Sequence, residues 1–302
     1  MAIILGGIDS LKNLVDLLKK DGVTHLESLN DILKFKEFCK HKVKESEAIA
    51  RQEHDIQILR QNAIIVAHVS EKKTDPTNKT RFRNFIELLV FRFQLFKLKR
   101  ELNRLEKKTE KIISQKISQL AGSSLKSKHL FDSNHALIQG ALGEQKALDE
   151  LRKLPDTFYV INNFQLRLFK PIYNKKTKQR VFTIQADHIV LGTSGVFLIE
   201  TKNWSKGTIK RAISFTPVDQ VKRTNFALFC YLNPQTSGLF SLFFKAKKIT
   251  VRSILLMTGQ MTEERDPFVK VVNLSELNNY ITNFSPVLTK EEVKQVLNKL
   301  LR

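Results

Sequence analysis

The chain has 302 residues, of which 42% are hydrophobic and 27% charged, enough apolar material for a sizeable core. Its 51 Lys and Arg residues against 30 Asp and Glu give a net charge of +21, which indicates an anionic partner, nucleic acid first and an anionic membrane surface second. Two distant cysteines exclude a disulfide framework and a cysteine-rich zinc site. No apolar run reaches the roughly 20 residues of a transmembrane helix. The first residues lack the features of a signal peptide, so we expect a cytoplasmic protein.

Residues 1–125 are predicted to form a helical region, with one or two short helices within residues 1–40. Two long helices should follow as an antiparallel hairpin over about residues 43–120. The polar segment 71–80, which contains the helix-breaking Pro76, is predicted to be its turn. The second helix has an apolar seam in steps of three and four, typical of a coiled coil: Leu88, Phe91, Leu95, Leu98, Leu102, Leu105, Thr109 and Ile112.

A coiled coil is most often a spacer or an oligomerisation device, and we predict a homodimer or a higher oligomer. An intramolecular hairpin may leave the seam partly uncovered, because the seam of the first helix is weaker. Basic residues on the second helix leave direct contact with nucleic acid open as an alternative. Residues 121–124, Ala-Gly-Ser-Ser, are predicted to form a linker.

The hydrophobic period changes after residue 134. A helix is expected over residues 136–154, followed by strands at 158–164, 181–192 and 196–202, with a basic turn at 174–180. A second helix at 218–232, strands at 249–257 and 269–272, and a closing helix at 290–301 complete the pattern. This order predicts a mixed α/β domain over residues 134–302.

Charged residues stand at the ends of two of these apolar strands. Asp187 begins one strand, and Glu200 and Lys202 end the next. Glu200 and Lys202 share a face because side chains two apart in a strand point the same way. If the turn at residues 192–195 closes a hairpin, Asp187 lies opposite them. Two carboxylates and an ammonium at one place suit Mg²⁺ binding and phosphodiester hydrolysis.

Glu144 adds a third carboxylate, from the first helix of the domain. It follows Gly140-Ala141-Leu142-Gly143, whose small residues allow the helix to approach the sheet closely.

The segments Gly-x-x-Gly-Glu, Gln-Ala-Asp-His-Ile-Val and Gly-Val-Phe-Leu-Ile-Glu-Thr-Lys-Asn-Trp, together with Gln220, resemble the nuclease-related domain (NERD). NERD is a branch of the PD-(D/E)XK nuclease superfamily, and the resemblance covers about residues 134–260. It implies a restriction-endonuclease-like core in the order helix, three strands, helix, strand. It further implies that Asp187, Glu200 and Glu144 bind metal, that Lys202 is the catalytic lysine, and that Gln220 contacts phosphate or fixes the lysine.

Two departures from the family pattern are visible. Lys206 separates Ser205 from Gly207 where family members often have Gly directly, and Thr224 stands where related exonucleases carry a tyrosine. The second departure puts exonuclease processivity in doubt, whereas metal binding is unaffected.

The basic residues near these motifs are candidates for nucleic-acid binding: Lys175, Lys176, Lys178, Arg180 and Lys206. A solvated turn is the alternative for the first four. Trp204 is expected to pack at the strand exit, with base stacking as the alternative. His188 should point to the opposite face from Asp187, as a core histidine.

These observations predict a Mg²⁺-dependent nuclease, with Mn²⁺ as a substitute, that acts on DNA more readily than on RNA. A role in defence against foreign DNA is suggested by analogy with other nucleases that carry an added region. A catalytically inactive nucleic-acid-binding or adaptor protein is the main alternative. A scaffold at a membrane surface is a weaker one.

Overall fold

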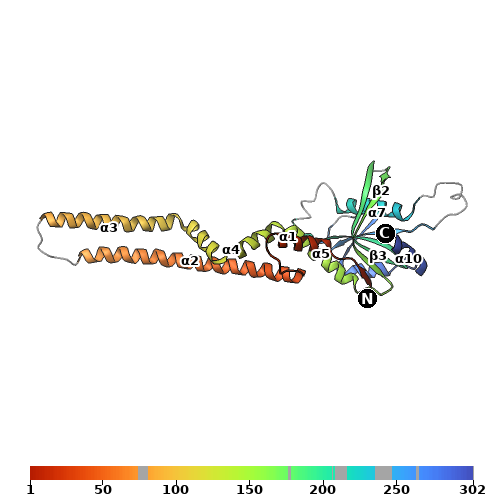
Figure 1. Ribbon diagram of the computed structural model, residues 1–302, viewed down its shortest axis with the longest axis horizontal. Coiled ribbons are helices and arrows are strands. Elements are labelled where there is room, and N and C mark those ends of the chain that lie inside the picture. Colours follow the sequence, from red (N-terminus) through yellow and green to blue (C-terminus); the bar gives the residue numbers. More distant parts are fainter. Residues whose placement is uncertain are drawn as a thin grey trace. The chain divides into compact units, whose positions relative to one another are not determined.

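The computed structural model describes residues 1–73, 81–175, 178–205, 207, 216–234, 247–262 and 265–301 (Figure 1). The chain forms two compact units. The first unit combines Met1–Leu29 with His135–Arg302 and is called the nuclease unit, after the resemblance noted in its sequence; the second, Asn30–Asn134, is called the long-helix unit. No helix among the described residues is long and apolar enough to cross a membrane.

The long-helix unit consists of α2 (Leu29–Lys73), α3 (Arg81–Lys107) and α4 (Thr109–Ser133). α2 and α3 run side by side and antiparallel, as three contacts in regular steps show (Figure 1). A ring nitrogen of His54 lies 3.2 Å from the carbonyl oxygen of Leu105, Gln61 donates to the carbonyl oxygen of Leu98, and the His68 ring stacks on Phe91. Each step is seven residues on both helices, so the expected antiparallel hairpin is confirmed. Its turn, residues 74–80, lies outside the described residues.

The predicted seam is the side of α3 that faces α2, but the pairing covers it only in part. Phe91, Leu95, Leu98, Leu102 and Leu105 are all half-buried. The predicted linker at residues 121–124 is wrong, because α4 continues through it with a kink at Ala121 (φ −140°, ψ 31°). Ala121 and Ser124 are buried, and Ser124 hydrogen-bonds to the thiol of Cys39 on α2, so packing overrides the weak helix propensity of this segment.

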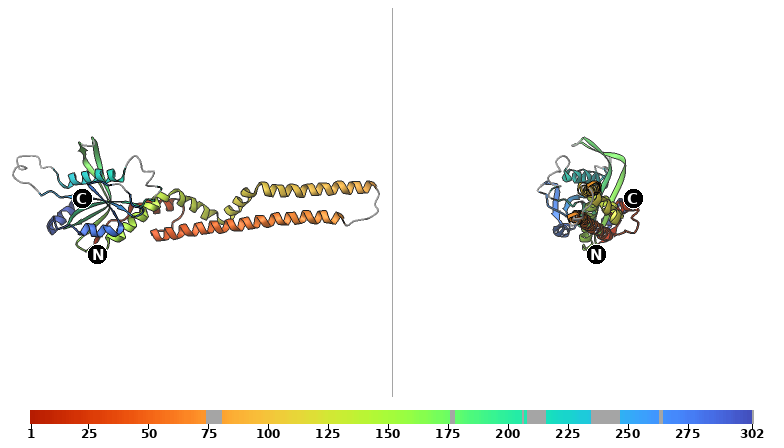
Figure 2. Two further views of the ribbon diagram at one scale, coloured as in Figure 1. Left: turned by 180° about the vertical axis from the view of Figure 1, so that it is seen from behind. Right: turned by 90° about the vertical axis from the view of Figure 1, so that its left-hand side faces the viewer.

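The nuclease unit is built on a six-stranded mixed sheet in the order β1-β2-β3-β4-β5-β6. Its strands are β1 (Ile3–Leu5), β2 (Tyr159–Asn174), β3 (Gln179–Gly192), β4 (Gly195–Lys202), β5 (Val251–Met257) and β6 (Val269–Asn273). β2, β3 and β4 form an antiparallel meander, and β1, β5 and β6 pair in parallel with their neighbours. The β2–β3 hairpin extends beyond the other strands (Figure 2).

Helices cover both faces of this sheet. α5 (His135–Leu151) and α9 (Leu274–Thr282) pack on one face, with Val190, Phe197 and Ile254 in the core beneath them. α7 (Pro217–Leu232) and α10 (Lys290–Leu300) pack on the other, over Ile189, Leu198 and Leu255. The order α5, β2, β3, β4, α7, β5 confirms the expected mixed α/β, nuclease-like core.

The N-terminal segment differs from the expectation that residues 1–125 form one helical region. β1 pairs in parallel with β2, and α1 (Asp9–Lys20) packs against α5. The β-branched Ile3 and Ile4 favour a strand, and Leu14 and Leu18 of α1 are fully buried in the nuclease unit. The boundary of the helical region therefore lies near residue 29, and the first 29 residues belong with the sheet.

Candidate active site

The β3–β4 hairpin aligns the two acidic residues singled out from the sequence. Gly192 pairs with Gly195 across a two-residue turn, and Gly195 has a positive φ of 119° that favours glycine. The ladder runs from this turn to the pair His188 and Ile199. The next position places Asp187 opposite Glu200. The predicted juxtaposition of these two residues is therefore present.

The expectation that Asp187 begins its strand is wrong, because β3 starts at Gln179 and pairs with β2 on both sides of this residue; Asp187 lies just past the last pair of β3 with β4. Its Oδ2 accepts a hydrogen bond of 2.6 Å from the backbone N–H of Thr201. Burial raises the pKa of Asp187 well above its usual range, and the charges of Glu200 and Glu144 raise this pKa further. The carboxylate thus sits in a place that disfavours a bare negative charge, which is the condition under which a cation binds well.

Glu200 is 5% exposed, and one of its carboxylate oxygens accepts two hydrogen bonds. Lys202 Nζ lies 2.6 Å from Glu200 Oε1, and Gln220 Nε2 from α7 donates to the same oxygen over 2.6 Å. Glu200 and Lys202 share a face of β4, as their spacing predicted. Gln220 comes from the first turn of the helix that covers this face, which explains how a residue 20 positions away reaches the site.

Glu144 reaches the site from α5, because this helix lies very close to the ends of β4 and β5. A side chain at Gly143 would meet Asn203 Cβ at 2.9 Å and Thr258 Oγ1 at 3.0 Å, so the expected close approach at this glycine is confirmed. Burial raises the pKa of Glu144, Ser10 counters this with a hydrogen bond, and the charges of Glu200 and Asp9 add to the rise. These mutual electrostatic effects place Glu144 near the charges of Asp187 and Glu200.

The donor set fits a hard divalent cation held by few protein ligands. Asp187 Oδ1 and Glu200 Oε2 accept no hydrogen bond from the described residues, whereas the other oxygen of each carboxylate is already bonded. No group of three Asp, Glu, His or Cys side chains in the described part of the chain is placed to hold a metal ion, so the structure does not bring Glu144 together with Asp187 and Glu200 as the expected third ligand. Mg²⁺ commonly takes one or two carboxylates and keeps several waters, so Asp187 and Glu200 suffice as its first ligands.

A cavity of about 730 Å³ opens beside this cluster. Glu144, Thr201 and Lys202 line it together with Asn203, Trp204 and Gln260. Trp204 is half-buried against the core formed by α7 and α10 and also borders the cavity, so packing and contact with a ligand are compatible for this residue.

The basic hairpin tip is not part of this cluster. Lys175, Lys178 and Arg180 are exposed at the end of the β2–β3 hairpin, and Arg180 stands seven residues from Asp187 along β3, roughly 23 Å at about 3.3 Å per residue. Lys176 and Lys206 lie outside the described residues. The tip therefore remains a candidate only for contacts with nucleic acid at a distance from the acids.

His188 lies on the opposite face from Asp187, as predicted. It is 1% exposed, and its Nδ1 lies 2.8 Å from Asn162 Oδ1. Burial lowers the pKa of His188 to about 4, so the ring is neutral at physiological pH. Its Nε2 has no hydrogen-bond partner among the described residues.

Sequence reasoning missed Ser10 and the Thr201 backbone. Ser10 stands 134 positions before Glu144, and no spacing rule links the two. The backbone N–H of Thr201 carries no side-chain signal, although Asp187 at the end of a paired strand is where such a bond forms.

The mixed sheet between helices, with an aspartate inside β3 next to a glutamate and a lysine at the end of β4, is consistent with the class of nuclease-like α/β proteins. Residues 139–258 match the family model of NERD, the nuclease-related domain. The chain therefore carries a nuclease-related domain, and β1, α1 and the long-helix unit lie outside the match. No curated protein and no solved structure matched the chain.

Proposed function

We propose that this protein is a Mg²⁺-dependent nuclease that hydrolyses phosphodiester bonds, in DNA more readily than in RNA. The observation that carries the proposal is the convergence of Asp187, Glu200 and Lys202 beside an open cavity in a nuclease-related domain. The net charge of +21 supports a polyanionic substrate. We place this activity in the cytoplasm and, by analogy, in defence against foreign DNA.

Each side chain of the site has a separate role in the proposed hydrolysis. Asp187 and Glu200 hold the cation, which when bound polarises the phosphoryl group and supplies an acidic water. Lys202 neutralises Glu200 and can turn its ammonium to a phosphate oxygen. Gln220 fixes the orientation of Glu200, and Glu144 accepts hydrogen bonds from water at the rim of the cavity.

The direct test is incubation of the purified protein with linear, circular and single-stranded DNA and with RNA, in Mg²⁺, Mn²⁺ or EDTA. We expect cleavage in either metal, none in EDTA, and faster cleavage of DNA than of RNA. Cleavage of circular DNA would show endonuclease action. Tight, salt-sensitive binding without cleavage in any metal would instead show a nucleic-acid-binding adaptor and overturn the proposal.

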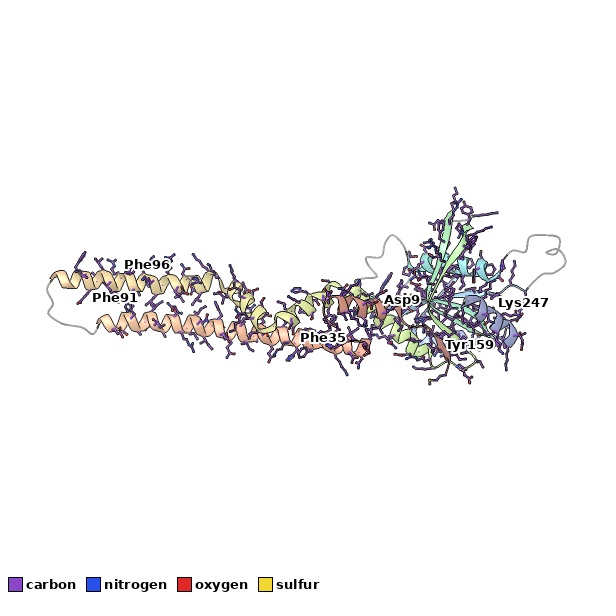
Figure 3. All side chains as sticks on the ribbon, viewed as in Figure 1. Asp9, Phe35, Phe91, Phe96, Tyr159 and Lys247 are labelled. Atoms are coloured by element: carbon purple, nitrogen blue, oxygen red, sulfur yellow. The ribbon has the colours of Figure 1, made fainter. Side chains whose placement is uncertain are left out.

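We also infer that the long-helix unit binds a second copy of this chain. Its distal part exposes large apolar side chains on both helices: Ile64 and Val66 on α2, and Phe85, Ile86, Leu88, Leu89, Val90, Phe93 and Phe96 on α3. Phe96, labelled in Figure 3, is 62% exposed. We name these nine residues the apolar band. Within residues 85–96 only Glu87 and Arg92 are charged.

The size of the apolar band favours a second copy as its occupant. A half-exposed large side chain leaves roughly 90 Å² in water, so nine of them expose on the order of 800 Å². A stable interface needs about 800 Å² from each partner, so the summed apolar area of these nine exposed side chains is of the size that self-association requires. Charged residues stand in the sequence beyond both ends of the apolar band. At the end away from the hairpin turn they are Arg60 and, within residues 97–100, Lys97, Lys99 and Arg100; at the end next to the turn they are Glu71, Lys72 and Lys73. Charges on both sides favour a four-helix packing of two hairpins over insertion into a membrane.

We expect the double substitution Phe93→Ser and Phe96→Ser to convert the assembly into monomers at micromolar concentration. Each phenylalanine contributes about 2 kcal/mol when buried, so the dissociation constant should rise at least 100-fold. Phe169→Ser is the matched control, because Phe169 is 99% exposed on the β2–β3 hairpin and should leave the mass unchanged. Light scattering of a wild-type protein that stays monomeric at 100 µM or so would refute self-association.

A further inference from the structure

The contact between Ser10 and Glu144 joins the candidate active site to a segment outside the nuclease-related match. Ser10 Oγ donates a hydrogen bond to Glu144 Oε1. Ser10 lies in the first turn of α1, and Glu144 lies in α5. The match covers residues 139–258, so the acid belongs to the family domain and its hydrogen-bond donor does not.

The backbone around Ser10 is built to hold this position. β1 fixes the preceding residues by pairing Leu5 with Ile161. The chain then turns at Gly6, where φ is +80° and a Cβ atom would meet the carbonyl oxygen of Asn162 at 2.8 Å. Only glycine fits a backbone that is both left-handed and this close to a neighbour. The side chain of Asn162 also donates to the carbonyl oxygen of Gly6 over 3.3 Å.

The opposing helix leaves room for the serine. Gly140 is one turn before Glu144 on α5, and a Cβ atom there would lie 3.9 Å from Ser10 Oγ. Burial of Leu14 and Leu18 holds the rest of α1 in place. The hydroxyl of Ser10 is therefore held by backbone and core contacts that do not depend on Glu144.

We propose that Ser10 is a positioning residue for Glu144 and that β1 and α1 are an integral part of the active site of this protein. By donating to Oε1, Ser10 holds the Glu144 carboxylate in one orientation beside the cavity that Glu144 lines. Loss of the hydroxyl leaves a half-buried carboxylate oxygen without this donor and the side chain free to rotate. This inference rests on the proposed nuclease function.

The test measures Mn²⁺ affinity by titration calorimetry, and cleavage rate at saturating Mn²⁺, for the full-length wild type and for Ser10→Ala. We expect Ser10→Ala to weaken Mn²⁺ binding about 3- to 10-fold and to lower the rate about 10-fold, with a melting temperature within about 2 °C of wild type. Ser10→Thr, which keeps the hydroxyl, should retain the Mn²⁺ affinity and the cleavage rate of the wild type. Ser133→Ala is the matched control, because its hydroxyl bonds only to the His129 carbonyl oxygen in α4 within the described structure.

A double-mutant cycle separates positioning from a general effect on the fold. In a Glu144→Ala background, which removes the acceptor of the Ser10 hydroxyl, Ser10→Ala should change Mn²⁺ affinity and rate less than twofold, because its effect passes through the carboxylate. Equal effects in both backgrounds, or no effect of Ser10→Ala in an otherwise active protein, would overturn the inference about Ser10 but not the proposed nuclease function. A wild type that neither binds Mn²⁺ nor cleaves nucleic acid would overturn the nuclease function itself.

Discussion

Asp187→Ala and Glu200→Ala should each reduce cleavage at least about 10³-fold, the scale observed when one member of an interdependent catalytic set is removed. Each substitution removes a candidate cation ligand that approaches from its own strand. DNA binding should persist or become tighter, because a negative charge that faces the phosphates is lost. Cleavage rate, binding and melting temperature are measured on the same samples in Mg²⁺.

Two further variants distinguish a catalytic role of these acids from a structural one. Lys202→Ala should also abolish turnover but weaken DNA binding slightly, since it removes a cation from the cavity. Asp149→Ala is the matched control, because Asp149 is an exposed acid on α5 that pairs with Arg152. Near wild-type cleavage by Asp187→Ala would show that the site is wrongly assigned. A loss of activity only in proportion to lost folded protein would show a structural role.

Asp187→Asn should stabilise the metal-free protein at pH 8 by about 1–2 kcal/mol, roughly 3–6 °C in melting temperature. Asn keeps an oxygen that can accept from Thr201 N–H and removes a charge that lies beside Glu200 and Glu144. The melting temperature is measured in EDTA across pH.

The pH dependence of this effect follows from the raised pKa of Asp187. A carboxyl with a raised folded-state pKa contributes stability that is complete below the unfolded-state pKa, here the ordinary 3.8, and is lost as the pH rises through the folded-state pKa. The advantage of Asp187→Asn should therefore vanish near pH 4 and grow towards pH 8. Mg²⁺ should raise the melting temperature of wild type and raise that of Asp187→Asn much less. An Asn variant that is less stable than wild type at pH 8 in EDTA would contradict this account.

The core of the nuclease unit could be predicted from the sequence because local patterns and motifs agree there. Continuous apolar runs on both sides of a Gly-Thr-Ser-Gly turn predicted the paired parts of β3 and β4, and the glycines of this turn predicted the register of Asp187 against Glu200. β1 and α9 were not predicted. β1 has only three residues, and its pairing with β2 spans more than 150 positions, which no local pattern reports.

The same limit explains the errors in the N-terminal half. The sequence of α1 predicts a helix with charged residues but does not indicate which unit the helix belongs to. Its contact with α5, far along the chain, assigns it to the nuclease unit. Ala-Gly-Ser-Ser at residues 121–124 has the composition of a linker, but buried contacts to α2 keep it helical. In both places long-range packing outweighs a local preference of less than about 1 kcal/mol per residue.

The ring contact between Phe35 and Phe131, with centroids 6.0 Å apart, has a consequence for the order of folding. It brings together the two ends of the long-helix unit, which interrupts the nuclease unit in the chain. Most of this unit is synthesised before β2, and its contacts are largely local, so it can form while β1 and α1 still lack their partners. Once formed, it shortens the loop between β1 and β2 roughly threefold and lowers the entropy cost of closing it by about 1 kcal/mol. By this argument the long helices favour formation of the six-stranded sheet.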